Sequence, residues 1–190
     1  MPTRAIFLDR DGVICVNRTD YVKTWDEFIF LPRVFDALAR LAASDFRVVI
    51  ATNQSGVNRG NMTQTALDDI HARMQSEIRA RGGRIDALYF CPHAPEENCE
   101  CRKPRTQMYR RAAEKFAMDF ARSYVIGDAV EDVQAAQALG ARAILVLTGR
   151  GAEHNGKLLD AGNSDFHAAT DLLDAVEWIE AREGLKRNAK

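Results

Sequence analysis

The stretch Ala5-Ile6-Phe7-Leu8-Asp9-Arg10-Asp11-Gly12 is the strongest indication of the fold in this sequence. Four consecutive apolar residues that include a β-branched and an aromatic side chain are typical of a short strand buried on both faces. Two aspartates follow at the point where this strand must end. Ligands of an open parallel sheet bind outside the carboxyl ends of its strands. Residues 9–12 therefore stand where a functional site is expected.

Short apolar runs alternate with stretches of helical periodicity along the rest of the chain. The predicted strands are residues 4–8, 47–51, 87–90, 124–126 and 143–147. The predicted helices are residues 34–43, 63–81, 108–116, 130–139 and 172–182. This alternation predicts an α/β fold of three layers, a parallel sheet with helices on both faces. Residues 149–167 are polar and contain glycines, and we expect a loop or a loose helix there.

The length of 190 residues is enough for one domain with a sizeable core. We expect residues 1–190 to form that single domain, with a frayed tail at 186–190. The 26 basic and 27 acidic residues give a net charge of −1, which argues against a general nucleic-acid binder. No apolar run approaches the length of a membrane span, and residues 5–8 are too few for a signal peptide. We therefore expect a cytoplasmic monomer without a membrane partner.

Three of the four cysteines fall in one short window together with a histidine. The window reads CPHAPEENCEC and places Cys91, His93, Cys99 and Cys101 in the order C-x-H-x5-C-x-C. Three thiolates and one imidazole complete the tetrahedral shell of a structural Zn²⁺ ion and leave no position for water. The alternative is a set of incidental thiols beside a surface histidine. A disulfide does not fit a reducing compartment.

Acidic side chains follow two of the predicted strands, those at residues 4–8 and 124–126. Asp9 and Asp11 are two residues apart, and Asp128 follows the apolar run at 124–126. Carboxylates that converge on one point require a cation between them, and ligands that are all oxygen suit Mg²⁺. We therefore expect a magnesium site formed by Asp9, Asp11 and Asp128.

The remaining strand ends supply groups that bind anions. Thr52 follows the strand at 47–51, and Arg102 and Lys103 follow the cysteine window. A metal ion, a lysine, a hydroxyl and backbone amides are what phosphoryl transfer requires, and a free aspartate adds a nucleophile. Each of these motifs alone is more often a simple turn. Their joint order at successive strand ends favours the functional interpretation.

Two further features are interpreted as structural. Residues 151–157 (GAEHNGK) have the spacing of a phosphate-binding loop, but Leu158 stands where the metal-binding hydroxyl belongs. We therefore predict a polar loop rather than a nucleotide site. His71 lies four residues after Leu67 on an apolar helical stripe, and we expect it at the edge of the core.

Together these motifs resemble the haloacid dehalogenase (HAD) superfamily of phosphatases, and within it the histidinol-phosphatase-like group. The similarity runs from about residue 3 to residue 151 and is carried by residues 7–12, 51–56, the cysteine window with Arg-Lys-Pro at 102–104, and residues 127–132. It implies a HAD-like Rossmannoid fold with little or no cap domain and a zinc-bound loop at 91–101. The chain departs from relatives at Thr106-Gln107, where Pro-Gly is usual, and at Ala129, where Ser or Lys is frequent.

The resemblance also implies roles for individual residues. Asp9 would be the nucleophile, and Asp11 would act as general acid and base while its backbone carbonyl binds Mg²⁺. Thr52 and Lys103 would hold the transferring phosphoryl group. The residues expected near the substrate are Tyr21, Asn53, Gln54, Ser55, Arg59 and Arg102.

The implied activity is the Mg²⁺-dependent removal of a phosphate from a small sugar phosphate. A heptose bisphosphate that serves the lipopolysaccharide core is the expected substrate, and histidinol phosphate is the alternative. A second phosphate requires extra cations, for which Arg59 and Arg102 are candidates. A different class of function is a non-catalytic module whose zinc loop binds a partner. The complete set of Asp9, Asp11, Thr52, Lys103 and Asp128 favours the enzyme.

Overall fold

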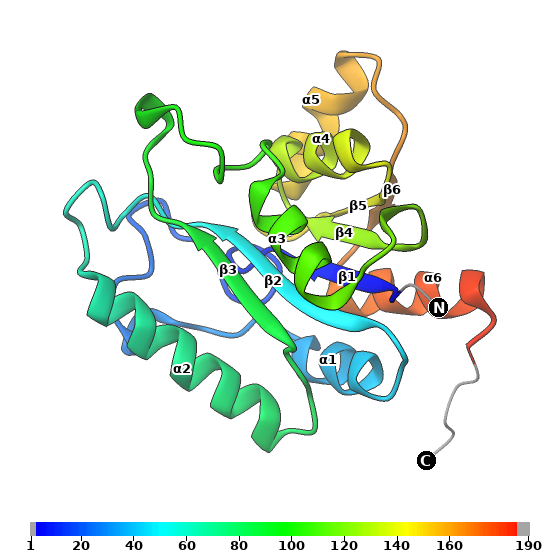
Figure 1. Cartoon of the computed structure of the whole chain (residues 1–190), viewed down its shortest axis with the longest axis horizontal. Helices are drawn as coiled ribbons and strands as arrows, with labels where there is room; N and C mark the ends of the chain where they lie inside the picture. The colour runs from blue at the N-terminus through cyan, green and yellow to red at the C-terminus, as the bar shows by residue number, and fades with distance from the viewer. Residues whose placement is uncertain (1–2, 186–190) are drawn as a thin grey trace.

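A parallel sheet forms the centre of the structure, a computed structural model that describes residues 3–185 (Figure 1). Its strands are β1 (Ala5–Leu8), β2 (Arg47–Asn53), β3 (Ala87–Cys91), β4 (Tyr124–Gly127), β5 (Arg142–Val146) and β6 (His167–Ala169). They lie in the order β3-β2-β1-β4-β5-β6, and every neighbouring pair is parallel. The chain thus builds outward from β1 to β3 and then returns to the other side of β1. The reversal places a topological switch point between β1 and β4, where ligands of such sheets bind.

Five helices connect consecutive strands, and a sixth follows the last strand of the described residues. They are α1 (Val34–Ala42), α2 (Gln64–Ala80), α3 (Gln107–Phe116), α4 (Val130–Leu139), α5 (Gly151–Asp160) and α6 (Leu172–Glu183). The side chain of Thr63 caps α2 by accepting a hydrogen bond from the backbone N–H of Ala66, and Asp171 caps α6 in the same way through Asp174. Side-chain oxygens at these positions satisfy N–H groups that have no partner within the helix.

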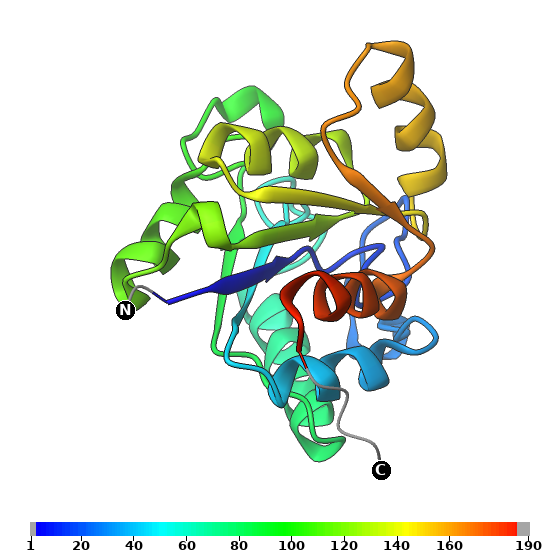
Figure 2. The same cartoon turned by 90° about the vertical axis from the view of Figure 1, so that its right-hand side faces the viewer.

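The helices divide between the two faces of the sheet, and the alternation of side chains along each strand decides which helix meets which residue (Figure 2). Ile6 and Leu8 of β1 point to the face covered by α1, α2 and α6. Ala5 and Phe7 point to the other face, which α3, α4 and α5 cover. The result is the three-layer α/β fold that the sequence predicts.

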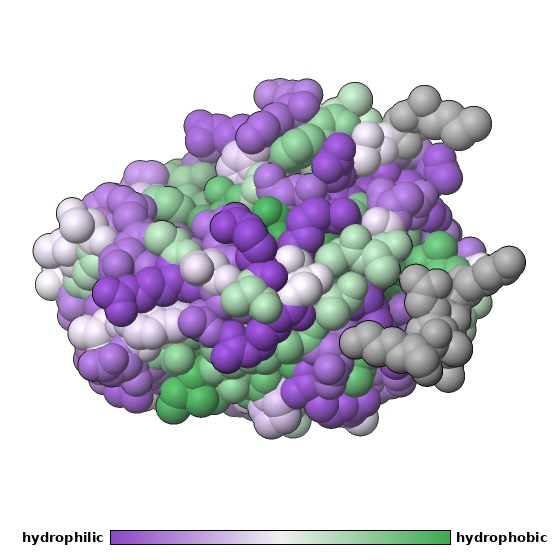
Figure 3. Space-filling model, turned by 90° about the horizontal axis from the view of Figure 1, so that it is seen from below, coloured by the Kyte–Doolittle hydropathy of each residue, from purple (hydrophilic) through white to green (hydrophobic). Residues whose placement is uncertain are grey.

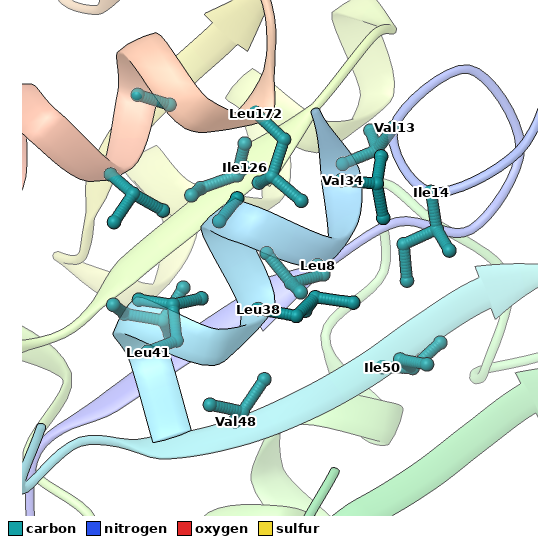
Figure 4. Packing of buried hydrophobic residues seen from close by; sticks show 14 of the residues in the cluster. Leu8, Val13, Ile14, Val34, Leu38, Leu41, Val48, Ile50, Ile126 and Leu172 are labelled. Atoms are coloured by element: carbon teal, nitrogen blue, oxygen red, sulfur yellow. The ribbon is translucent and has the colours of Figure 1, made fainter. Parts of the chain in front are cut away.

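Packing beneath α1 shows how the apolar pattern builds the core (Figure 4). Val34, Leu38 and Leu41 recur at helical spacing, and each is 2% exposed or less. Leu38 lies against Leu8 of β1 in Figure 4. Burial of one such side chain stabilises the fold by roughly 1.5–3 kcal/mol. Because α1 is anchored in this way, the strand before it and the loop between them are held in place.

The outer surface on the side that carries α1, α2 and α6 is a mosaic of hydrophilic side chains and smaller hydrophobic patches (Figure 3). Such a mixture is ordinary for an exposed protein surface. Among residues 3–185, none of the helices combines the length and the apolarity that a bilayer crossing requires.

One segment differs from the prediction. Residues 149–167 were expected to form a loop or a loose helix and 151–157 a polar loop, but residues 151–160 form the regular helix α5. Residues 167–169 form the edge strand β6, which the sequence did not indicate. The buried positions of α5 are Gly151, His154 and Leu158, and only Leu158 is a large apolar side chain, so the apolar pattern is too sparse to recognise. The replacement of Pro-Gly by Thr106-Gln107 leaves α3 regular from Gln107 onward. The predicted fraying of 186–190 lies outside the described residues.

Candidate active site

Three carboxylates meet at the switch point between β1 and β4. Asp9 directly follows β1, Asp128 follows β4, and Asp132 lies in the first turn of α4. One carboxylate oxygen from each lies within 4.8 Å of the others, and all three residues are buried. The backbone N–H of Asp9 donates to the carbonyl of Ile126 at 2.9 Å and so extends the pairing of β1 with β4. The sheet therefore fixes the backbone on which this group depends.

The group carries more negative charge than nearby cations neutralise. Burial and the charge of Asp9 raise the pKa of Asp128 to about 6. Burial also raises the pKa of Asp132 to about 7; Lys103 opposes this rise, and the charge of Asp9 adds to it. Buried carboxylates that stay ionised together need a cation between them. The donor set of oxygens alone fits a hard divalent cation such as Mg²⁺.

Lys103 is the cation that the protein itself supplies to this group. Its Nζ lies 3.0 Å from Oδ1 of Asp9 and 2.7 Å from Oδ1 of Asp132. Burial alone would lower the pKa of Lys103, but the charges of Asp132 and Asp9 raise it above its ordinary value. Asn53 fixes the backbone of Lys103 by accepting from its N–H at 3.0 Å and donating to its carbonyl at 3.3 Å. The end of β2 thus positions the lysine that follows the cysteine loop.

Asp11 lies beside this group in a hydrogen-bonded network of its own. Nη2 of Arg10 contacts both oxygens of Asp11, and Nε2 of Gln54 donates to Oδ2 at 2.7 Å. Gln54 also donates to the hydroxyl of Thr52 at 3.0 Å. Burial works to raise the pKa of Asp11, but Arg10 and Gln54 outweigh it and lower that pKa. The structure therefore holds Asp11 as a carboxylate.

Arg10 is a buried arginine whose guanidinium also contacts His71 of α2. Nη1 of Arg10 lies 3.2 Å from Nε2 of His71, and the two residues are 1% and 5% exposed. Burial, together with the charge of Arg10, lowers the pKa of His71 to about 3. A neutral imidazole accepts a hydrogen bond from the guanidinium, which an imidazolium could not do. His71 is thus a buried structural residue, and it also supports Arg10 and through it Asp11.

Two glycines approach Asp128 so closely that no side chain fits between them. A Cβ atom on Gly12 would lie 2.1 Å from Oδ2 of Asp128, and one on Gly149 would lie 2.3 Å from the same oxygen. Both glycines have positive φ, +80° and +57°, which favours glycine. The backbone N–H of Arg150 donates to Oδ2 of Asp128 at 2.9 Å, and Thr148 donates to the carbonyl of Gly12 at 2.6 Å. The segment after β5 thus closes over the end of β1.

The four predicted zinc ligands lie together after β3, in the loop that extends beyond the arrowhead of that strand in Figure 1. Sγ of Cys101 lies 3.0 Å from Sγ of Cys91 and 3.5 Å from Sγ of Cys99. Nδ1 of His93 lies 3.2 Å from Sγ of Cys101 and 3.5 Å from Sγ of Cys91. The four donor atoms all lie within 4.8 Å of one another, as a tetrahedral shell requires. The donor set fits Zn²⁺.

A cavity of about 230 Å³ opens at these strand ends. The predicted site residues that line it are Asp9, Asp11, Tyr21, Asn53, Ser55, Arg102 and Lys103. Its wall also includes Asn17, Thr19, Ala129, Glu131, Asp132 and Arg150. The hydroxyl of Tyr21 lies 3.4 Å from that of Ser55, and Arg102 donates to the carbonyl of His93 at 3.1 Å. The zinc loop therefore orients an arginine that faces this cavity.

Three residues predicted to hold the phosphoryl group or the sugar do not line this cavity, and neither does the buried Asp128. Thr52 and Gln54 are each 1% exposed and do not line this cavity, although Gln54 bonds directly to Asp11. Arg59 also lies outside the lining, where its Nη2 pairs with Glu96 at 2.9 Å on the surface. The expected contact of Arg59 with substrate thus has no support in this arrangement, because the zinc loop engages its guanidinium.

Several residues of the site were not singled out from the sequence. Asp132 belongs to the motif at 127–132 but was given no role, although it stands four residues after Asp128, a spacing that brings side chains together at the start of a helix. Arg150 lies between β5 and α5, in a segment that was interpreted as a loop or a loose helix. The burial of Arg10 has no indication in the sequence, because a charged residue at a strand end is expected to face solvent.

Comparisons with known proteins agree with this geometry. Residues 100–175 match the HAD-hydrolase-like family. The D-glycero-beta-D-manno-heptose-1,7-bisphosphate 7-phosphatase of Pseudomonas aeruginosa is 39% identical over 176 residues, which cover 93% of this chain and 99% of that protein. The protein of the same name from Neisseria meningitidis serogroup A is 41% identical over 173 residues, covering 91% and 90%.

A solved structure shows the same likeness in three dimensions. The crystal structure of D,D-heptose 1,7-bisphosphate phosphatase from B. bronchiseptica, complexed with magnesium and phosphate, matches with a TM-score of 0.88 and 38% identity. The match covers 95% of this chain and 99% of that one. The similarity therefore extends over nearly the whole chain.

Proposed function

Because this chain belongs to the HAD-like family of heptose bisphosphate phosphatases, we propose that it removes the 7-phosphate of D-glycero-D-manno-heptose 1,7-bisphosphate. The observation that carries this function is the meeting of Asp9, Asp128 and Asp132 with Lys103 at the carboxyl ends of β1 and β4, where Asp9, Asp132 and Lys103 line one cavity and Asp128 lies buried behind them. Such an arrangement of carboxylates, a divalent cation and a lysine performs phosphoryl transfer. The activity is that of a Mg²⁺-dependent phosphomonoesterase that serves the heptose precursors of lipopolysaccharide.

The carboxylates of Asp9 and Asp128 and the backbone carbonyl of Asp11 would hold Mg²⁺. When bound, this ion neutralises the charge that develops on the phosphoryl oxygens. Asp132 lies within reach of the same point, but its Oδ1 accepts from Lys103 at 2.7 Å. Asp132 therefore fixes the lysine that binds the phosphoryl group.

Asp9 would act as the nucleophile. One of its carboxylate oxygens forms a bond to phosphorus while the bond between phosphorus and the sugar oxygen breaks, which gives an aspartyl phosphate and a sugar alkoxide. Oδ1 of Asp9 also accepts from the backbone N–H of Arg10 at 2.7 Å, which limits the rotation of the side chain. Water then attacks the phosphorus, the aspartyl bond breaks, and inorganic phosphate leaves.

Asp11 would move the protons of both steps. Its carboxyl gives a proton to the departing sugar oxygen in the first step and accepts one from the attacking water in the second. The contacts of Arg10 and Gln54 favour the carboxylate, which is the form that the second step needs. A phosphate dianion bound nearby raises the pKa of a carboxyl group and so favours the protonated form that the first step needs.

Other predicted residues would hold the substrate. Lys103 and Thr52 would donate to the transferring phosphoryl oxygens, and Asn53 keeps Lys103 in place. The residues that would contact the sugar and the second phosphate are Tyr21, Asn53, Ser55 and Arg102, which line the cavity. Gln54 would act by orienting Asp11 and Thr52.

A structural Zn²⁺ ion would be held by Cys91, His93, Cys99 and Cys101. It would cross-link a loop that has little core of its own, and the loop in turn carries Arg102 and Lys103. Thiolate ligands remain available in a reducing compartment, which supports a location in the cytoplasm.

The test is phosphate release from purified protein with Mg²⁺ and either heptose 1,7-bisphosphate or histidinol phosphate. We expect kcat/KM for the heptose bisphosphate to be higher than kcat/KM for histidinol phosphate. A chelator of divalent cations should abolish phosphate release. The reverse preference would assign the chain to histidine synthesis. The absence of release from any phosphomonoester would support a non-catalytic module instead.

A further inference from the structure

Glu131 is an acidic residue of the cavity wall that the chemistry above leaves without a role. It lines the 230 Å³ cavity of the site, and it also lines an adjoining cavity of about 310 Å³ beside the zinc loop. Arg102 and Lys103 are the other residues common to both linings. Glu131 therefore stands between the place where phosphate would react and the space into which the rest of a substrate would extend.

The carboxylate of Glu131 has an unused hydrogen-bonding position. Its Oε2 is buried and meets no donor among residues 3–185. Within that same part of the chain it forms no ion pair with the cations of the wall, and each of these cations contacts another acceptor. Lys103 contacts Asp9 and Asp132, Arg102 donates to the carbonyl of His93, and Arg150 donates to Asp128.

An unpaired buried oxygen is costly, and a ligand that brings a donor removes the cost. The leaving group of the proposed substrate is a sugar, which presents several hydroxyl groups and no acidic group apart from its phosphates. A hydroxyl can donate directly to a carboxylate. A phosphate cannot take that place, because two negative groups in contact repel each other.

We propose that Glu131 accepts a hydrogen bond from a hydroxyl of the leaving sugar and thereby selects polyhydroxylated phosphate esters; this inference rests on the proposed function. A site built to bind a hydroxyl discriminates strongly against an analogue that lacks it, since the polar group of the site is then left unpaired. Glu131 is thus a specificity residue that touches the substrate away from the reacting bond.

The test compares two substrates in the variants Glu131→Ala and Glu131→Gln. The first substrate is heptose 1,7-bisphosphate, and the second is p-nitrophenyl phosphate, whose leaving group carries no further hydroxyl. We expect Glu131→Ala to lower the ratio of their kcat/KM values by about 10- to 100-fold, the size of one hydrogen bond to a charged group. Most of the change should be in KM for the heptose. Glu131→Gln keeps a carbonyl acceptor and should recover part of the ratio.

Glu153→Ala is the matched control. Glu153 also lies in the first turn of a helix, but it pairs with Lys157 on the surface and does not line either cavity. It should leave the ratio unchanged. A ratio that is equally unchanged in Glu131→Ala would overturn the proposal, as would equal losses on both substrates.

A third substrate separates a hydroxyl from an ammonium group as the donor. Histidinol phosphate carries an ammonium group. An ammonium would form an ion pair that needs the negative charge of Glu131, whereas a hydroxyl needs only an oxygen that accepts a hydrogen bond. If both Glu131→Ala and Glu131→Gln lost activity on histidinol phosphate while both kept full activity on the heptose bisphosphate, the carboxylate would serve as a counter-ion and the proposal would be wrong. If wild-type protein failed on heptose bisphosphate, the proposed function itself would fail first.

Discussion

Nη2 of Arg10 lies 2.9 Å from Oδ1 and 3.0 Å from Oδ2 of Asp11, its neighbour in the chain. The pair is part of a buried network, because Arg10 also contacts His71 and Asp11 also accepts from Gln54. An arginine that is 1% exposed has no water to replace its partner. The same carboxylate is therefore responsible for neutralising Arg10 and for the proton transfers of the proposed reaction.

Asp11→Asn should impair both the proton transfer and the neutralisation of Arg10, whereas a change of an exposed aspartate should impair neither. We expect kcat to fall by about 10²–10⁴, the range of general acid–base catalysis. Stability should fall by about 3–5 kcal/mol, because the variant leaves the buried charge of Arg10 without a counter-ion. Steady-state phosphate release and thermal melting measure the two. Asp20→Asn is the control, since Asp20 also accepts from an arginine but at an exposed position. Normal turnover in Asp11→Asn would contradict the role of this carboxyl.

His71 should make the stability of the fold depend on pH. Its pKa is about 3 in the folded protein and about 6.5 when unfolded, so the unfolded chain binds more protons between these values. Stability is therefore complete above pH 6.5 and is lost as the pH falls below it, by about 1.4 kcal/mol at pH 5.5. Urea unfolding of wild type and His71→Gln at pH 7.5 and 5.5 measures this difference. The variant should lose less stability than wild type; equal losses would show that His71 is not responsible.

Gly12→Ala should displace Asp128 or the turn that holds Gly12. The new Cβ would lie 2.1 Å from Oδ2 of Asp128, so Asp128 or the turn must move. Positive φ alone costs alanine about 1–2 kcal/mol. Gly60→Ala is a matched control, because Gly60 has φ +73° but a Cβ added there would meet no atom within 4 Å. Both variants should lose stability, and only Gly12→Ala should lose Mg²⁺-dependent phosphate release. Full activity in Gly12→Ala would show that this close approach is not needed.

Asp9→Asn should abolish turnover while the fold remains. The amide matches the carboxylate in shape but does not attack phosphorus, so no aspartyl phosphate forms. Circular dichroism checks the fold, and phosphate release checks the chemistry. Asp160→Asn, at an exposed helix end, should behave as wild type. Retained release in Asp9→Asn would exclude Asp9 as the nucleophile.

Cys99→Ser should remove zinc and reduce stability before it affects the chemistry. A structural zinc contributes directly to the free energy of folding. We expect the metal content measured by atomic emission to fall and the melting temperature to drop, while activity at low temperature persists in part. Cys15→Ser controls for the loss of a thiol in the metal measurement, since Cys15 lies outside the cluster and the variant should keep its zinc. A zinc-free protein as stable as wild type would rule out a structural role for the metal.

Much of the fold could be predicted because it follows from local patterns. The runs around Phe7 and Val49 are continuous and apolar, and the stripe of Leu67, Ile70 and Met74 has clear helical spacing, so strands and helices were found close to their true bounds. Helix α5 was expected only as a loop or a loose helix, because His154 fills a buried position at which the helical pattern requires an apolar residue.

Part of the site could likewise be predicted from the sequence, and part could not. Asp9, Asp128 and Lys103 could be predicted to converge because each follows a strand of one parallel sheet. The hydrogen bonds of Asp132 to Lys103 and of Gln54 to Asp11 could not, because they depend on side-chain directions that only packing determines. The ion pair of Arg59 with Glu96 could not be predicted either, because it joins two loops that no local sequence spacing brings together.

The closure of Gly149 over Asp128 has a consequence for how the enzyme becomes active. Asp9, the proposed nucleophile, and Gly149 are 140 residues apart in the chain, yet Thr148 and Arg150 contact Gly12 and Asp128. The contacts around Asp9 and Asp128 are therefore complete only when β1 and the segment after β5 have both joined the same sheet. Folding of the first half alone would leave the proposed active site unfinished.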